Sequence, residues 1–223
     1  ALLHELRVLE RVRPRHWRGS GPYHFALGPN GAAIVAANLG LEVRDLPWRR
    51  DAIAGLERSQ RLAHLVGTNG FFTALVRSAR HRAGCQLAEW WSEARCAAAW
   101  GEVVRPDGYG VWAEDGDRLP FLLEYDTGSE QLTRLGAKLP GYARLAKAAG
   151  HPTWVLFALG SVSREAGARR ELAHPGVPVA TAVLRPGGAP DGPVWLPVGD
   201  SGPRRRLIDL GHPSRALRQR RPA

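Results

Sequence analysis

The sequence predicts an α/β protein in which a mixed β-sheet is flanked by helices and preceded by a small basic module. Helix-like and strand-like segments follow one another in the order αβββαβ through the middle of the chain, and a further strand comes after them. Of the 223 residues, 44% are hydrophobic and 23% are charged. This is the composition of a globular protein with a buried core, and it excludes a disordered chain and a coiled coil.

Composition divides the chain into three parts. Residues 1–45 form the basic module, residues 51–185 form the α/β domain, and residues 186–223 form a tail rich in Gly, Pro and Arg. The tail contains Arg204-Arg205-Arg206 and a second basic run from Arg215 to Arg221. We therefore expect the tail to be a mobile basic arm.

The sequence of the basic module predicts a helix, a hairpin and a second helix. Leucines at helical spacing predict a helix from Ala1 to Val12, and residues 13–27 predict two short strands around Gly19 to Pro22. An alanine-rich helix follows from Ala32 to Leu39. This is the order of the second half of a winged helix-turn-helix, whose hairpin touches the DNA backbone. The residues expected to contact DNA are Arg7, Arg11, Arg13, Arg15 and Arg18. A packed helix beside a basic surface loop is the alternative.

The α/β domain begins with a long helix predicted from Asp51 to Arg82, where apolar residues recur at three- and four-residue steps. His64 and Asn69 lie on this helix, and a functional or a purely structural role is open for both. A segment containing Trp90-Trp91 comes next, and then a hairpin and an amphipathic helix. The last predicted elements are a strand from Thr153 to Leu159, a helix from Arg164 to Leu172 and a strand from Val177 to Leu184.

Charge predicts a nucleic-acid partner. The net charge is +10 and the isoelectric point is about 10.8. Residues 1–100 hold 14 basic and 8 acidic side chains, residues 101–160 hold 6 and 8, and residues 161–223 hold 11 and 5. Two basic flanks around an acidic centre fit double-stranded DNA bound around a carboxylate pocket. Solubility is the alternative explanation, and a homodimer is left open.

Cysteines and targeting signals are uninformative. Cys85 and Cys96 offer neither a disulfide framework nor a zinc knuckle. We find no signal peptide and no apolar stretch long enough to span a membrane, so we expect a cytoplasmic protein. Because Ala1 already lies in a predicted helix and the chain has no Met, we expect further residues to precede it.

Three carboxylates are expected to converge in the central hairpin. Asp115-Gly116 between two alternating runs is a strong signal for a type I′ turn, and that turn places Asp107 opposite Glu124. Side chains alternate along a strand, so Asp126 lies on the same face as Glu124. Carboxylates this close need a cation, and a set without His or Cys favours Mg²⁺ or Mn²⁺. A longer turn would shift the register and separate Asp107 from Glu124.

The helix after the hairpin adds a lysine to this patch. A capping box at Thr127 to Glu130 predicts where the helix starts, and Pro140 should kink or interrupt it. Gln131, Lys138 and Tyr142 then share one side at helical spacing. The chain has 29 Arg and only two Lys, Lys138 and Lys147, and a compact ammonium suits a scissile phosphate better than a guanidinium does. An accidental surface lysine is the alternative.

These motifs resemble the PD-(D/E)xK nuclease superfamily. Pro106-Asp107 and Glu124-Tyr125-Asp126 match its pattern, with Asp126 in the place of the usual lysine and Lys138 as a migrated lysine. More specifically, about residues 1–160 resemble the replication-relaxation family of actinobacterial plasmids and mobile elements, related to MobC-type relaxases. The matching residues are Tyr23 to Gly31, His64, Asn69, Arg105-Pro-Asp-Gly108, Phe121 to Gly128 and Lys138-Leu-Pro-Gly-Tyr142. The resemblance implies a DNA-binding module joined to a domain that nicks or relaxes plasmid DNA.

The leading functional hypothesis is metal-dependent cleavage of a DNA phosphodiester bond. Asp107, Glu124 and Asp126 would hold Mg²⁺ or Mn²⁺, and Lys138 would stabilise the nucleophile. Arg105 and Gln131 join the basic flanks as expected DNA contacts. In a variant of this hypothesis Tyr142 attacks the phosphate and forms a phosphotyrosine.

Two other classes of function stay open. One is a non-catalytic DNA-binding regulator of replication or transcription that keeps a nuclease-like fold. The other is a protein-interaction subunit whose basic tail docks on DNA or on a partner. Motifs of P-loop ATPases, zincins and serine esterases are absent from the sequence.

Overall fold

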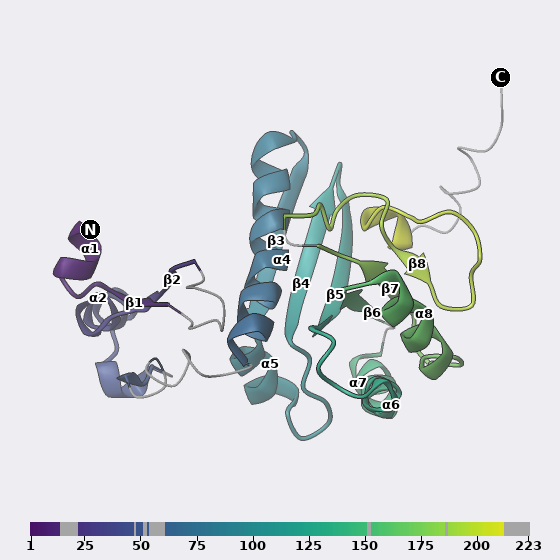
Figure 1. Cartoon of the computed structure of the whole chain (residues 1–223), viewed down its shortest axis with the longest axis horizontal. Helices are drawn as coiled ribbons and strands as arrows, with labels where there is room; N and C mark the ends of the chain where they lie inside the picture. The colour runs from purple at the N-terminus through teal and green to yellow at the C-terminus, as the bar shows by residue number, and fades with distance from the viewer. Residues whose placement is uncertain are drawn as a thin grey trace. The chain divides into compact units, whose positions relative to one another are not determined.

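The computed structural model describes residues 1–13, 22–46, 48–50, 53, 61–150, 153–185 and 187–211. The chain divides into two compact units, residues 1–63 and residues 64–223 (Figure 1). The second unit holds a mixed six-stranded sheet with helices on its faces, so the predicted α/β class is confirmed. No helix in the described part of the chain is both long and apolar enough to cross a membrane.

The first unit contains a short helix, an antiparallel hairpin and a second helix. The elements are α1 (Leu2–Glu5), β1 (Leu9–Val12), β2 (His24–Leu27), α2 (Pro29–Leu39) and the 3₁₀ turn η1 (Val43–Asp45). Helix α2 starts with Pro29 and ends at Gly40, whose φ of 66° suits a C-terminal glycine. The order helix, hairpin, helix is the predicted one. Residues 14–21, which include Arg15, Arg18 and most of the predicted Gly19–Pro22 turn, lie outside the described residues.

The helix predicted from Ala1 to Val12 is wrong beyond Glu5. Arg7 has a φ of 54°, a left-handed conformation that ends the helix. Residues 9–12 then pair as a strand, with Leu9 opposite Leu27. The leucines at helical spacing therefore lie in two different elements, the helix α1 and the strand β1. Packing of Leu9 across the hairpin stabilises the chain more than one further residue on a four-residue helix would.

The second unit arranges its six strands in sequence order. Strands β5 and β6 are central, β5 to β7 run parallel, and the other neighbouring pairs run antiparallel. The elements are α4 (Arg61–His81), β3 (Cys85–Ser92), α5 (Glu93–Trp100), β4 (Gly108–Glu114), β5 (Asp117–Asp126), α6 (Leu132–Ala137), α7 (Leu139–Ala149), β6 (Trp154–Leu159), α8 (Val162–Glu171), β7 (Val179–Val183), β8 (Leu196–Pro197) and η2 (Ile208–Gly211).

The β4–β5 hairpin has the register that its turn predicts. Asp115 and Gly116 have φ values of 51° and 90°, which are the positive angles that a type I′ turn requires. The ladder runs from Glu114 opposite Asp117 to Gly108 opposite Leu123, and the backbone N–H of Asp107 donates to the carbonyl of Leu123 at 2.9 Å. The register therefore carries Asp107 toward Glu124, as the sequence predicts.

The two sheet faces pack against different helices (Figure 1). Phe72 and Leu75 of α4 pack with Leu123 on one face. On the other face Leu122 packs with Leu135 of α6, Tyr142 of α7 and Ala168 of α8. Because side chains alternate along β5, Glu124 and Asp126 share the face of Leu122, toward helices α6, α7 and α8.

Helix α6 begins later than the predicted capping box at Thr127 to Glu130 would place it, and it ends at Ala137. It begins only at Leu132, and its N-cap Gln131 makes no side-chain capping hydrogen bond, so the predicted capping box is wrong. Instead, the side chain of Asp126 accepts a hydrogen bond from the backbone N–H of Gly128 at 3.1 Å. This contact forms a turn after β5, and the helix begins only after that turn. The predicted interruption is confirmed, since α7 restarts at Leu139 with Pro140 in its first turn.

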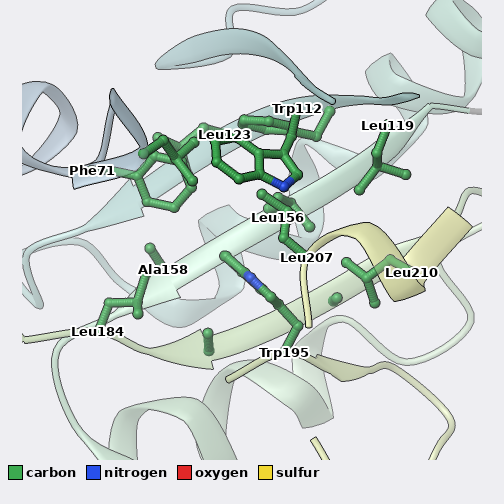
Figure 2. Packing of buried hydrophobic residues seen from close by; sticks show 14 of the residues in the cluster. Phe71, Trp112, Leu119, Leu123, Leu156, Ala158, Leu184, Trp195, Leu207 and Leu210 are labelled. Atoms are coloured by element: carbon green, nitrogen blue, oxygen red, sulfur yellow. The ribbon is translucent and has the colours of Figure 1, made fainter. Parts of the chain in front are cut away.

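The C-terminal segment is part of the core. Trp195, Leu207 and Leu210 are at most 1% exposed and pack with Trp112 and Leu119 of the central hairpin (Figure 2). The predicted mobile arm is therefore wrong for the segment before residue 212, because these apolar side chains complete the face that α4 covers only partly.

Two arginines of that segment also neutralise buried carboxylates. Arg204 pairs with Glu165 at 2.5 Å, and Arg206 pairs with Glu114 at 2.6 Å. A buried carboxylate needs such a partner, so Arg204-Arg205-Arg206 is not a free basic run. The second run, Arg215 to Arg221, lies outside the described residues.

Candidate functional site

The centre of the candidate site is the carboxylate of Glu124, near the carboxyl end of β5. Glu124 is 2% exposed. The Lys138 ammonium donates to its Oε2 at 2.5 Å, and the Tyr142 hydroxyl donates to its Oε1. Lys138 lies at the break between α6 and α7, and Tyr142 follows one turn later on α7. The helix break therefore aims a cation and a hydroxyl at one buried carboxylate.

Asp107 lies beside Glu124, just before β4 begins, and is 8% exposed. Its Oδ1 lies 3.1 Å from Nε2 of His64, which α4 supplies from the opposite side of the sheet. Its Oδ2 accepts the backbone N–H of Tyr125 at 2.7 Å. Asp107 is thus held in place by one side chain and one strand, while the charge of its carboxylate acts on Glu124.

Burial and charge shift the titration of this cluster. Desolvation raises the pKa of Glu124 to about 7, with a further increase from Asp107 that Lys138 and Tyr142 oppose. Burial raises the pKa of the Tyr142 hydroxyl well above its ordinary value. Burial alone would lower the pKa of Lys138, but the charge of Glu124, the hydrogen bond to Glu124 and the charge of Asp107 together raise that pKa. The hydrogen bond that His64 donates to Asp107 raises the pKa of His64.

Asp126 lies on the same sheet face but binds a different partner. Arg164 donates to Asp126 through Nε at 2.6 Å and through Nη2 at 3.0 Å, and it also donates to the carbonyl of Glu130. Both Asp126 oxygens are therefore taken by a bidentate ion pair. Sequence reasoning missed Arg164. The contact arises because Asp126 pairs with Leu159 in parallel strands, which puts the start of α8 beside Asp126, and the sequence around Arg164 gives no signal of it.

The other predicted contact residues lie apart from this cluster. Arg105 is exposed and donates through Nε to the carbonyl of Gly101 at 3.3 Å, and Gln131 is an exposed N-cap. Asn69 is exposed on α4. In the first unit, the exposed Arg7 ends α1, while Arg11 and Arg13 lie over the ring of Tyr23 at 4.6 and 4.7 Å. Thus the structure brings together Asp107, Glu124, Lys138 and Tyr142, and adds His64.

The cluster fits a hard divalent cation only through Asp107 and Glu124. Each of their four oxygens accepts one hydrogen bond or ion pair and keeps a second lone pair. Two carboxylates plus waters and a substrate phosphate are a usual Mg²⁺ environment. Among the described residues no group of three or more His, Cys, Asp or Glu could hold a metal ion, which agrees with the engagement of Asp126 by Arg164.

Comparison with known proteins gives one positive result. A family model described as replication-relaxation matches residues 1–154. The match includes the hairpin of the first unit and the residues from His64 to Tyr142 that form the cluster. No curated protein and no solved structure matches the chain.

Proposed function

We infer the function from one premise, which is that the chain belongs to the replication-relaxation family. Membership indicates a role in the replication of plasmids or mobile elements. The proposed activity is nicking of double-stranded plasmid DNA by a PD-(D/E)xK-like site in the second unit that depends on Mg²⁺ or Mn²⁺. The first unit is the proposed DNA-binding module, of partial winged-helix type, and its order of helix, hairpin and helix supports this assignment.

The observation that carries the proposal is the contact of Lys138 with a buried carboxylate next to a second carboxylate. The chain has 29 Arg and only two Lys, and one of these lysines, Lys138, lies in the cluster. Its Nζ is 2.5 Å from Oε2 of Glu124. The side chain of Lys138 keeps 30% of its surface exposed, whereas that of Glu124 keeps 3%. The ammonium is therefore the part of the pair that a DNA phosphate can approach, and it would offset the charge that develops during cleavage.

Asp107 and Glu124 would hold the divalent ion, which supplies Lewis acidity at the phosphate and lowers the pKa of water. His64 and the N–H of Tyr125 keep Asp107 oriented for this task. Asp126 is engaged by Arg164 in a bidentate ion pair and is given no ligand role in the proposal. The proposal thus gives two of the three predicted carboxylates a ligand role.

The proposed role of Tyr142 is to position Glu124. Tyr142 is 1% exposed, its hydroxyl donates to Glu124, and burial raises its pKa. A nucleophilic tyrosine needs access to the phosphate and a base to remove its proton. These observations favour water over Tyr142 as the attacking group.

Plasmid nicking tests the proposal. We expect the full chain to convert supercoiled plasmid to the open circle with Mg²⁺ or Mn²⁺, and to stop when EDTA removes the metal. Asp107→Asn keeps the shape of the side chain but removes its charge, so nicking should fall by about 100-fold or more, the size expected for losing one electrostatic contact. Glu171→Gln, at an exposed helix end, is the matched control. Equal activity of Asp107→Asn and the control would contradict the proposal.

A non-catalytic DNA-binding regulator is the second candidate, and one observation favours it. Every oxygen of Asp107, Glu124 and Asp126 already accepts a hydrogen bond or an ion pair within the protein. A network of this kind also serves as a folding element without any ligand. Duplex binding that is independent of metal, together with no nicking under either ion, would select this candidate.

A further inference from the structure

One face of the β1–β2 hairpin combines arginines with aromatic rings. Arg11 lies opposite Phe25 in the ladder, and the same register carries Arg13 to Tyr23. Side chains alternate along a strand, so these four residues share one face. Val12 belongs to the other face and is 4% exposed, which shows that the other face is the packed one.

The shared face is open to solvent and positively charged. Phe25 is 61% exposed and Tyr23 is 46% exposed. The guanidinium groups of Arg11 and Arg13 lie 4.6 and 4.7 Å from the centre of the Tyr23 ring, and Arg13 also donates to the Tyr23 hydroxyl at 3.4 Å. These cation–π contacts hold both charges over the Tyr23 ring, and Arg11 also lies opposite the exposed Phe25 in the ladder.

The ligand that suits this face must offer a flat apolar surface and a negative charge together. A phosphate alone satisfies the arginines and leaves the Phe25 ring in water. A B-form duplex keeps its base faces stacked on each other, where a ring on a hairpin does not reach them. An unpaired strand offers both, since bases stack on aromatic rings while the phosphates pair with nearby cations.

We propose that the Arg11, Arg13, Tyr23 and Phe25 face of the hairpin binds single-stranded DNA, with a base stacked on Phe25. This inference rests on the proposed DNA-directed function and names the form of DNA that the first unit holds. Tyr23 and Phe25 are two residues apart, so their side chains are separated by about 6.7 Å along the strand. That spacing suits neighbouring nucleotides of an extended strand, one on Phe25 and the next beside Tyr23 and its arginines.

The test uses the full chain and two fluorescein-labelled probes, an oligothymidine single strand and a duplex of equal length, at one salt concentration. Phe25→Ala should weaken binding of the single strand by about 5- to 150-fold, the range for loss of one stacked base, and should leave duplex binding unchanged. Phe25→Trp should restore the single-strand affinity. Leu39→Ala, which alters a side chain 62% exposed on α2, is the control and should change neither affinity.

Each other outcome contradicts a specific part of the account. If Phe25→Ala weakens both probes equally, or neither, the stacking role is overturned while DNA binding by the chain stands. If the unmodified chain binds neither probe, the proposed DNA-directed function fails together with this inference. A circular dichroism spectrum equal to that of the unmodified chain shows that a loss in Phe25→Ala does not come from misfolding.

Discussion

Lys138→Ala is expected to slow plasmid nicking by about 100- to 1,000-fold, the cost of removing one preorganised charge from a phosphate in the transition state. Lys138 supplies the only ammonium in contact with the buried cluster among the described residues, at 2.5 Å from Glu124. The measurement is the initial rate of open-circle formation at saturating Mg²⁺.

Lys147→Ala is the matched control for this prediction, because it removes the other lysine of the chain from an exposed position on α7. Its nicking rate should equal that of the unmodified chain. The fold should survive Lys138→Ala, since a carboxyl with a pKa of about 7 can take up a proton when its cation is removed. Nicking by Lys138→Ala at the control rate would remove Lys138 from the mechanism.

Glu124→Gln is expected to change how stability depends on pH. The folded protein raises the pKa of Glu124 from 4.5 to about 7, so between these values the folded state binds more protons at this site than the unfolded state. Stability therefore falls as pH rises through this window, by an amount on the order of 3 kcal/mol. The neutral amide of Gln does not titrate, so Glu124→Gln should lack this loss.

Urea unfolding in EDTA at pH 4.5 and at pH 7 measures the effect in both proteins. The raised pKa of His64 also makes stability fall as pH rises. Glu124 is the smallest of the causes of that rise, so most of the His64 effect is common to both proteins and the difference between them reports mainly on Glu124. An identical change in unfolding free energy for the two proteins would show that Glu124 titrates normally and is not buried as the structure has it.

The part of the site that the sequence predicts depends on local rules. A type I′ turn at Asp115-Gly116 and the two-residue period of a strand are enough to bring Asp107 toward Glu124. The helix that follows must return over the same face, because β5 and β6 are parallel and joined by a crossover. The sequence therefore predicts that Lys138 lies near these carboxylates, and lysine is rare in this chain, which has only two.

What the sequence did not predict depends on contacts between distant segments. Nothing near Arg164 in the sequence shows that it will pair with Asp126, and His64 comes from a helix on the opposite sheet face. Composition made residues 187–211 look like a tail, although Trp195 and Leu207 are fully buried in the core. The spacing of Leu9 from the preceding leucines fits a helix, and only the pairing of Leu9 with Leu27 on the distant strand β2 makes it a strand residue.

Buried carboxylates outside the candidate site are also paired with side chains from distant parts of the sequence. Glu114 is paired by Arg82 and Arg206, and Glu165 is paired by Arg204. These arginines neutralise acids inside the fold and are engaged there. An ion pair adds nothing to the net charge, so the excess of +10 comes from basic side chains outside such pairs.

A titration of Mn²⁺ followed by electron paramagnetic resonance tests most directly whether Asp107 and Glu124 form one cation site. The unmodified chain and Glu171→Gln should each remove Mn²⁺ from solution with the same affinity, and Asp107→Asn should remove much less. If Asp107→Asn takes up as much Mn²⁺ as the unmodified chain, or if the unmodified chain takes up none, the two carboxylates are not a metal site and the account of cleavage is contradicted.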